Sequence, residues 1–561
     1  MRLLSKEESW HLLREKVFGK EGLCSYKLEK AGKKIAEKCE GLPLTIVTVG
    51  KVLLEAENKT WEYWNEVAEK QNSVFVDAYE QMYEVLFRSY ENLPQHLKLC
   101  FLYMGVFLEK HEIIRSKLID LWIADGILES YFYGSEYLEK LVSSSVAMAL
   151  KQSYNGQTKT CSLHSTFWYL CNKEAAKSKF FYALNSIDDA LEEGGIESQR
   201  RLCVRNNVLF GIKDVYDFVG SISTVRSLLC TGLYHQFPVP ICFDLILLRV
   251  LDALTIRFYE FPLEVVKLVQ LRYLALTSNG ELHFSISKLS SLEYLIVHRH
   301  LDIVKSDKDS SYLPKEIWDM KELKYLHVMG SDIPNPWEKE SLLPNLVTLL
   351  DASPQSCTRA VLERMPRLKK LGIRIESDGP FSFFDHISHL RELRSLKCVV
   401  ANPFLESNRT SLLAPLSIFS SCLKKLSMSG FGYSWEEMKT IGLLPNLEVL
   451  KLRCYAFRGV KWETRKDGFA KLKFLSIEDT DLVQWTVERG SLPLLQFLSI
   501  KHCYKLKEIP RVILSTLRKI ELVDCSSLVV RCAKGITEEL LEKRYDLLEI
   551  NVLSSWDDVK V

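Results

Sequence analysis

The sequence of 561 residues lacks the features that would tie it to a membrane or to nucleic acid. Its best apolar run, Leu42 to Val49, is ended by Gly50 and Lys51 and falls far short of the roughly 20 residues that a membrane span needs. The charged opening MRLLSKEESWHLLREKVF contains no apolar stretch of a secretory signal. The net charge of +2 gives no global attraction to nucleic acid or to an anionic membrane. We therefore predict a cytoplasmic protein without a transmembrane segment or a nucleic-acid partner, and leave a peripheral place on membranes open.

The sequence also lacks the patterns of a metal site or a catalytic centre. The fifteen cysteines are scattered, and only Cys161, His164 and Cys171 have ligand-like spacing, without a fourth ligand or a paired C-x-x-C. Neither G-x-S-x-G nor H-E-x-x-H occurs, and no dinucleotide fingerprint is complete. We expect no metal, no catalytic residues and no enzyme activity.

A repeated motif, L-x-x-L-x-L, is the strongest signal that is present. Copies begin at Leu248, Leu271, Leu292, Leu323, Leu346, Leu368, Leu393, Leu423, Leu447, Leu472, Leu495 and Leu517. The spacing is typical of leucine-rich repeats, in which each unit adds one short strand and a return segment. Alternate leucines point into the solenoid, and the residues between them face the concave side. The motif therefore predicts a horseshoe-shaped solenoid over residues 225–561, and binding is its default function.

Two kinds of side chain stand out on the predicted concave face. The third motif position is aromatic at Tyr273, Tyr294, Tyr325, Phe474 and Phe497. The middle repeats are basic instead, at Lys369, Lys370, Arg394, Lys397, Lys424, Lys425 and Lys451. Aromatic residues are favoured interface anchors, and lysines attract acidic surfaces. Both groups are candidate partner-binding residues, and a solvated face with chance lysines is the alternative left open.

The first 180 residues have helical periodicity. A Ser-x-x-Glu capping box at Ser5 and Glu8 opens the first helix, and Pro43 stands where a proline suits the first turn of another. The pattern predicts a helical domain over 1–72 and a compact winged-helix-like domain over 73–180. Residues 181–224 are expected to hold a linker and the first repeat cap, which makes the chain an α+β multidomain protein.

Four segments resemble the nucleotide-binding (NB-ARC) leucine-rich-repeat disease-resistance proteins of plants. Gly41-Leu42-Pro43-Leu44 matches their GLPL motif, and Leu93 to Gly126 resembles the signature that follows it. Leu163-His164-Ser165 stands where the family has Met-His-Asp, and SKEESWHLLREKVF resembles the segment before GLPL. The late-blight resistance group is the most similar. The front half is thus identified as an NB-ARC remnant.

The resemblance implies a nucleotide switch with several departures. In the family this proline contacts adenine and this histidine reaches the β-phosphate of ADP, which assigns those roles to Pro43 and His164. The phosphate-gripping G-x-x-x-x-G-K-[ST], the paired aspartates that organise magnesium and the amino-terminal signalling domain have no counterpart here. Ser165 replaces the aspartate of the third motif, and Leu108 replaces a proline. We expect a chain truncated at its amino terminus that does not bind ADP or ATP by itself.

The family further implies recognition of a pathogen effector or a guarded host protein, and control of a defence switch that ends in cell death. A nucleotide-binding domain, in the same chain or in trans, is the second expected partner. The alternative function is a leucine-rich-repeat adaptor, such as the substrate receptor of a ubiquitin ligase, with no nucleotide switch.

Overall fold

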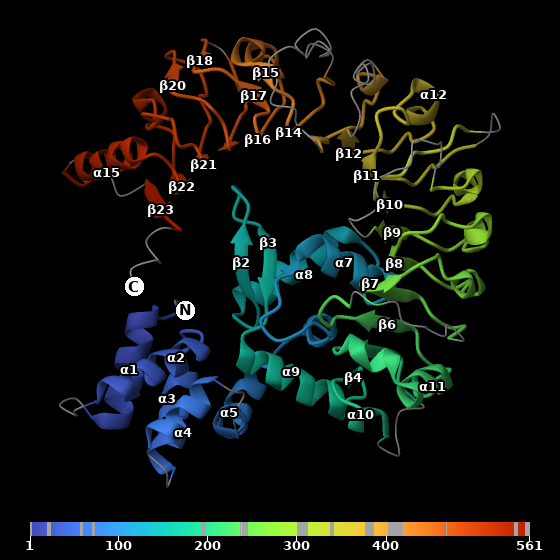
Figure 1. The fold of residues 1–561 in the computed structure, drawn as a ribbon, viewed down its shortest axis with the longest axis vertical. Helices are drawn as coiled ribbons and strands as arrows, with labels where there is room; N and C mark the ends of the chain where they lie inside the picture. Colours follow the sequence, from blue (N-terminus) through green and yellow to red (C-terminus); the bar gives the residue numbers. More distant parts are fainter. Residues whose placement is uncertain are drawn as a thin grey trace. The chain divides into compact units, whose positions relative to one another are not determined.

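The structure is a computed structural model that forms two compact units. Unit 1 consists of residues 1–235 and 239–255, and unit 2 of residues 236–238 and 256–561. The described residues are 3–19, 24–56, 60–69, 73–191, 198–235, 237, 245–299, 312–336, 341–375, 386–401, 419–466, 468–542 and 548–555. Figure 1 traces the chain, and each unit is described by itself.

Unit 1 opens with a helical module made of α1 (Lys6–Phe18), α2 (Tyr26–Lys38), α3 (Pro43–Glu55), α4 (Trp61–Glu69) and the first half of α5 (Ser73–Glu91). Its apolar core contains buried residues from Trp10 to Ala78. These residues recur at helical spacing, so each helix buries one apolar face in the core. The predicted capping box is confirmed, because the Ser5 amide donates to Glu8 Oε2 at 2.8 Å and the Glu8 amide donates to Ser5 Oγ at 3.2 Å. Pro43 is the first residue of α3, as its missing N–H allows.

A second module follows in unit 1, and α5 leads into it. Its elements are α6 (Gln95–Met104), β1 (Ile113–Ile114), α7 (Arg115–Ala124), α8 (Tyr131–Ser143), β2 (Met148–Gln152), β3 (Thr158–Ser162) and α9 (Ser165–Lys177). The strands form an antiparallel sheet in the order β1-β3-β2. Phe101, Tyr103, Leu118 and Trp122 are fully buried, so this module has its own core.

Unit 1 ends with the beginning of the parallel sheet. The strands β4 (Tyr182–Leu184), β5 (Arg201–Val204), β6 (Ser227–Cys230) and β7 (Val250–Phe258) pair in chain order. Between them lie α10 (Asp188–Leu191), η1 (Asn207–Gly211) and α11 (Lys213–Ser221). Strands β4 and β5 lie in the segment for which a linker and cap were expected, and neither carries the leucine motif.

Unit 2 contains one parallel strand per repeat. In chain order these are β8 (Tyr273–Ser278), β9 (Tyr294–His298), β10 (Tyr325–Val328), β11 (Thr348–Ala352), β12 (Lys370–Ile375), β13 (Ser395–Val400), β14 (Lys425–Ser429), β16 (Val449–Arg453), β19 (Phe474–Glu478), β21 (Phe497–Lys501), β22 (Lys519–Val523) and β23 (Glu549–Leu553). Figure 1 shows them following one another along an arc.

The return segments of unit 2 contain short helices and edge strands. They are η2 (Leu263–Lys267), η3 (Phe284–Lys288), η4 (Lys315–Asp319), α12 (Arg359–Leu362), β15 (Tyr433–Ser434), η7 (Trp435–Glu437), α14 (Met438–Gly442), β17 (Phe457–Arg458), β18 (Lys461–Thr464), β20 (Gln484–Val487), η8 (Arg511–Ile513) and α15 (Ser527–Glu542). Behind the later strands, Trp462 stacks on Trp435 and on Trp485, with ring centroids 5.0 and 4.9 Å apart. These stacked rings fill the space between successive repeats.

The leucine-rich-repeat solenoid is confirmed. Each strand from β7 to β22 in the parallel sheet begins two residues after the first leucine of one of the twelve motif copies. The leucines at the motif's first position are buried in every copy. The alternation of leucines with other residues therefore predicted correctly where each strand begins and which leucines are buried.

Candidate functional site

The two residues that the resemblance assigned to nucleotide lie at helix starts in unit 1. Pro43 begins α3 and is half-buried, whereas His164 caps the amino terminus of α9 and is only 4% exposed. The Nδ1 atom of His164 accepts the Thr166 amide at 3.3 Å. In a neutral ring the proton is then on Nε2, so this buried edge offers a donor.

Glu40 brings these two places together. Its Oε2 atom accepts the Ser165 amide at 3.0 Å and faces His164 Nε2 at 3.5 Å. Its Oε1 atom accepts the Ser165 hydroxyl and pairs with Lys110 Nζ at 3.0 Å. The Glu40 side chain is 15% exposed. The turn before Pro43 therefore supplies a carboxylate to the start of α9, and sequence reasoning did not identify it.

Left-handed backbone conformations occur at both Glu40 and Lys110, the two charged residues of this site. Glu40 has φ 53° and Gly41 has φ 72°, so two left-handed residues in succession follow the end of α2. Lys110 also has a left-handed φ of 60°. Non-glycine residues rarely adopt this region because Cβ crowds the backbone. At Gly41 a Cβ would lie 2.4 Å from the carbonyl oxygen of Leu4, so the turn has little freedom to change.

The charges at this site stabilise each other. Burial raises the pKa of Glu40, but His164, Ser165 and Lys110 together lower it below its ordinary value of 4.5. Burial lowers the pKa of His164 below 6.5, against the opposing effect of Glu40. The pair thus consists of an ionised carboxylate and a neutral imidazole near neutral pH.

The residues present do not fit a nucleotide phosphate in this arrangement. The histidine edge that the resemblance would direct at a phosphate is directed at the Glu40 carboxylate. A phosphate there would meet a negative charge at contact distance, and like charges repel strongly where water is scarce. The donors at the start of α9 are already used by an anion from the chain itself.

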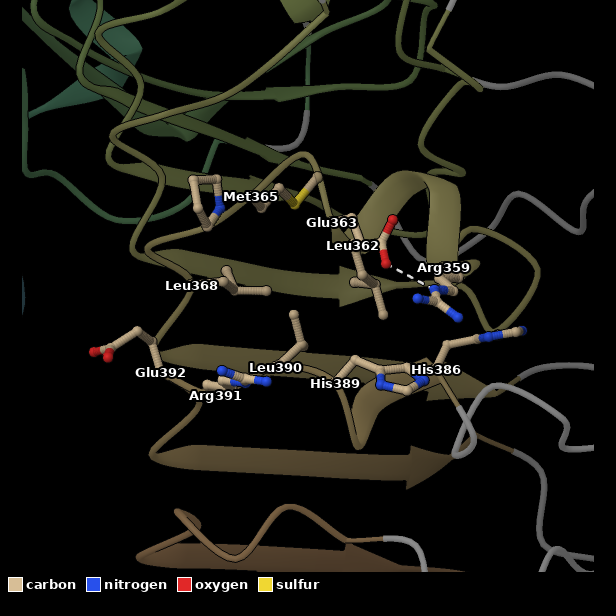
Figure 2. A pocket seen from close by; sticks show the side chains of 11 residues that line it. Arg359, Leu362, Glu363, Met365, Leu368, His386, His389, Leu390, Arg391 and Glu392 are labelled. Atoms are coloured by element: carbon tan, nitrogen blue, oxygen red, sulfur yellow. Dashed lines mark hydrogen bonds and ion pairs between the residues drawn. The ribbon is translucent and has the colours of Figure 1, made fainter. Parts of the chain in front are cut away.

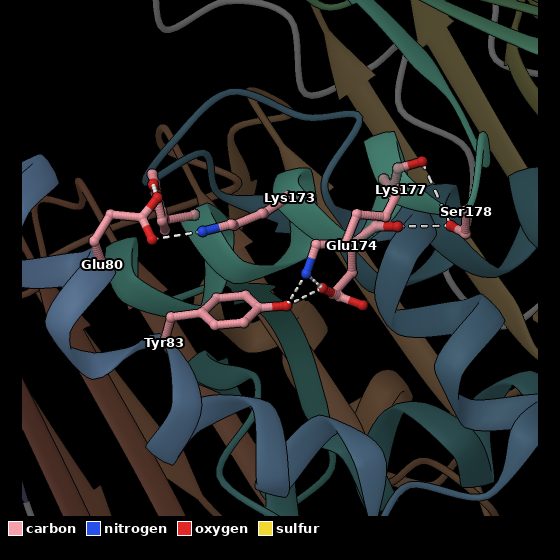
Figure 3. A network of polar contacts seen from close by, with 8 residues as sticks. Glu80, Tyr83, Lys173, Glu174, Lys177 and Ser178 are labelled. Carbon is pink, nitrogen blue, oxygen red and sulfur yellow. Dashed lines mark hydrogen bonds and ion pairs between the residues drawn. The ribbon is translucent and has the colours of Figure 1, made fainter.

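A second polar joint connects α5 to α9, as Figure 3 shows. Lys173 Nζ lies 2.5 Å from Glu80 Oε2, and the hydroxyl of Tyr169 also donates to Glu80. Tyr83 donates to Glu174 and accepts from Lys177. The ion pair of this joint is more exposed than the Glu40 site. The joint connects α5 to α9 independently of Glu40.

Buried charges also fasten the second module to the first strands of the repeat sheet. Asp125 at the end of α7 accepts from Arg201 Nε on β5 at 2.5 Å and from the Ser227 hydroxyl on β6. Lys117 on α7 pairs with Asp252 on β7 at 2.6 Å. Both aspartate side chains are 2% exposed. Buried charge pairs therefore join α7 to three of the first strands of the repeat sheet.

A third contact at this junction involves Arg205, which follows β5. Its guanidinium donates to the Gly105 carbonyl and to Asn172 Oδ1, and it lies over the Trp168 ring at 4.8 Å from the centroid. Arginine is suited to such a buried position because its planar group donates in several directions.

On the repeat sheet of unit 2, the predicted aromatic residues occupy the same position of their strands and form two separate runs. Neighbouring strands pair Tyr273 with Tyr294 and Tyr294 with Tyr325, and farther along Phe474 with Phe497. Tyr273 and Tyr294 are buried, at 1% and 6% exposure, whereas Tyr325, Phe474 and Phe497 are partly exposed. The two buried tyrosines have little surface to offer a partner in this structure.

The predicted basic residues gather on adjacent strands of the same face. Strand pairing places Lys370 beside Ser395, Ser395 beside Lys425, and Lys397 one strand from both lysines. Lys369, Lys370, Lys424 and Lys425 are all exposed. We call Lys369, Lys370, Lys397, Lys424 and Lys425 the basic patch.

The positive field of the basic patch reaches a neighbouring histidine. Burial lowers the pKa of His327, and His298, Lys397 and Lys370 lower it in the same direction, to about 4 in total. Acidic residues balance the basic ones at both sides, where Glu293 pairs with Arg272 and Lys324, and Glu448 pairs with Lys424 and Lys473. Between these two carboxylates the sheet presents mostly positive charge.

A surface pocket of about 250 Å³ lies among the return segments before β12 and β13. Figure 2 shows Leu362, Leu368 and Leu390 lining it, with the Arg359–Glu363 ion pair at its edge. The lining mixes leucines with charged side chains that pair locally, and it contains none of the predicted site residues.

The strand pattern and the sequence comparison agree on the class of protein. A family profile described as "Leucine-rich repeat region" matches residues 213–544, and this chain belongs to that family. Its relatives include several late blight resistance protein homologs of Solanum demissum. One of them is 31% identical over 97% of this chain and 42% of its own length, and another is 31% identical over 97% of this chain and 44% of its own length.

The chain thus spans less than half the length of these curated relatives, and its resemblance to the late-blight resistance group is confirmed. A solved leucine-rich-repeat protein of Leptospira interrogans is 17% identical and matches 66% of this chain and 99% of its own, with a TM-score of 0.34. Among the described residues, no helix is both long enough and apolar enough to cross a membrane.

Proposed function

We propose that this chain is the regulatory and recognition portion of an intracellular plant disease-resistance receptor. The repeat sheet recognises a pathogen effector or a guarded host protein, and unit 1 passes the event to a nucleotide-dependent defence switch. The relatives' names and the repeats support the receptor class. The element order α6, β1, α7, α8 and the β2–β3 ribbon supports a winged-helix-like regulatory module.

The buried junction between the second module and the first repeats is the observation that carries this proposal. Asp125 and Asp252 are charged groups that would be costly to bury without Arg201, Ser227 and Lys117 as partners. A junction built this way moves as one body, so displacement of the first repeats displaces α7. A receptor needs such a connection, because a ligand acts on a switch only through a difference between its two states.

The basic patch is the surface that we assign to an acidic partner. The test captures proteins from infected leaf tissue with the unmodified chain and with a variant in which glutamate replaces Lys369, Lys370, Lys424 and Lys425. The variant should capture less of the acidic partner, and raised salt should reduce capture by the unmodified chain in the same way. A matched control reverses Lys439, Lys466, Lys505 and Lys507, which are exposed outside the parallel strands. If the captured set is the same for both quadruple variants, the patch is a solvated face.

We also propose that this chain is not an enzyme and that ADP or ATP is held mainly by a nucleotide-binding domain in the same receptor or in trans. Even with the His164 edge free of Glu40, Pro43 and His164 together would supply only roughly 2 kcal/mol, whereas millimolar binding needs about 4 kcal/mol. Calorimetry with ADP on this chain should therefore show no micromolar binding. Micromolar binding that disappears in His164→Ala would contradict the proposal.

A further inference from the structure

We propose that Glu40 is a built-in anion ligand of the α9 amino terminus, and that it latches the helical module onto α9. A phosphate-bearing ligand can use this site only by displacing the Glu40 carboxylate. The inference concerns unit 1 alone and does not depend on what the repeats recognise.

The first support is the convergence of donors on one carboxylate. The amide and hydroxyl of Ser165 donate to it, the Lys110 ammonium lies 3.0 Å from it, and the Nε2 edge of His164 faces it. The start of a helix is favourable for an anion because its free amides and the helix dipole point there. Nε2 of His164 is buried and has no hydrogen-bond partner of normal geometry among the described residues. The polar groups that surround it are the Glu40 carboxylate, which faces it, and the Cys39 backbone. The site is therefore built to hold an anion, and Glu40 is that anion.

The second support is the separation in sequence between the ligand and its site. Glu40 ends the α2 turn in the helical module, and Ser165 begins α9 125 residues later. Lys110 comes from a third segment, the loop between α6 and β1. One carboxylate thus joins three segments, and its loss frees the helical module from α9 at this point while the Glu80 joint remains.

The third support is the residue at position 165. Its hydroxyl donates to Glu40, so an aspartate at this position would place a second carboxylate against the first. The serine is the compatible partner for a resident glutamate, since it donates a hydrogen bond and brings no charge. The serine at position 165 and the glutamate at position 40 are therefore chemically matched in this chain.

The test measures thermal unfolding of the full chain with increasing inorganic pyrophosphate, at ionic strength held constant with chloride. Glu40→Ala should unfold at a lower temperature than the unmodified chain, and pyrophosphate should restore the loss by filling the vacated site. The unmodified chain should not respond. Glu80→Ala is the matched control, because it removes another carboxylate that faces α9 but leaves the anion site occupied.

A second pair of variants keeps the test decisive if Glu40→Ala folds poorly. Ser165→Asp should lower the unfolding temperature of the unmodified chain and have little effect when Glu40 is replaced by glutamine. Hydrogen exchange of the Ser165 amide should accelerate in Glu40→Gln and slow again with pyrophosphate. Equal pyrophosphate shifts in all variants, or additive effects of Ser165→Asp and Glu40→Gln, would overturn the latch.

Discussion

Charged residues are used in opposite ways at the unit 1 junctions and on the repeat sheet of unit 2. Asp125 and Asp252 are almost fully buried, and each has a cation within 2.6 Å. Lys369, Lys370 and Lys425 are exposed beside other cations on one face. Buried pairs restrict geometry, because separating them leaves a charge without water, whereas exposed charges of one sign attract charges of the opposite sign. The comparison indicates that buried charge pairs hold unit 1 together, whereas the repeat sheet carries its charges at the surface.

Breaking a buried pair should have the largest effect. Asp125→Ala leaves Arg201 and Ser227 without their carboxylate, and we expect unit 1 to lose about 3–5 kcal/mol of unfolding free energy. Urea denaturation followed by circular dichroism measures the loss. Glu463→Ala is the control, because its ion pair with Lys461 is exposed. Equal stability of the two variants would mean that the junction does not hold unit 1 together.

Acid should have an intermediate effect through the latch. The pKa of Glu40 is lowered in the fold, so its contribution is present above its ordinary value of 4.5 and is lost as pH falls through the lowered value. The pKa of His164 is also lowered, so unfolding takes up a proton below about 6.5 and stability falls in the same direction.

Unfolding free energies measured from neutral pH down to about pH 3 check this sign. Below about pH 4.5 the unmodified chain should lose stability that Glu40→Gln does not lose, because the variant lacks the carboxylate that must be protonated. Above that pH the variant should lose more, because its His164 lacks the opposing effect of Glu40 and its pKa falls further. Parallel curves for the two proteins would contradict the assignment of an ionised Glu40 beside a neutral His164.

Reversing the basic patch should have the smallest effect on folding. Replacement of Lys369, Lys370 and Lys425 by glutamate changes exposed groups, and we expect the unfolding free energy to change by no more than about 0.5 kcal/mol per site. The pKa of His327 should rise at the same time, since Lys370 is one of the cations that lower it. Nuclear magnetic resonance titration of His327 reads out the field directly. An unchanged His327 would mean that the patch exerts no field there.

The sequence predicted the repeats far better than the junctions, for a physical reason. A repeat strand is specified by leucines two and three residues apart, so local spacing alone locates the strands of the parallel sheet from β7 to β22. Strands β4 and β5 were missed because Tyr182 and Arg201 begin short strands without the motif. Glu40 was missed because its partners lie far away in sequence, and no local period marks a turn residue that faces a distant helix.

The predicted site residues show the same difference between what local spacing determines and what it does not. Lys369, Lys370, Lys424 and Lys425 were predicted as surface residues and are exposed, although their partner-binding role stays a prediction. Alternation indicates which face a residue occupies, but it does not indicate that neighbouring strands bury Tyr273 and Tyr294 while leaving Tyr325 partly open. That difference depends on what packs over each strand.

The left-handed backbone at Glu40 has a consequence for genetics. Glycine adopts a φ of 53° without the roughly 1–2 kcal/mol that another residue incurs, so Glu40→Gly would relax the turn while deleting the carboxylate. The two effects have opposite signs, but the carboxylate accepts two hydrogen bonds from Ser165 and pairs with Lys110, and each hydrogen bond to a charged group contributes about 1.5–3 kcal/mol. The relaxed turn therefore offsets only part of the loss. A screen for abundant, folded protein should find this allele milder than Glu40→Ala, which deletes the same carboxylate and keeps the strain.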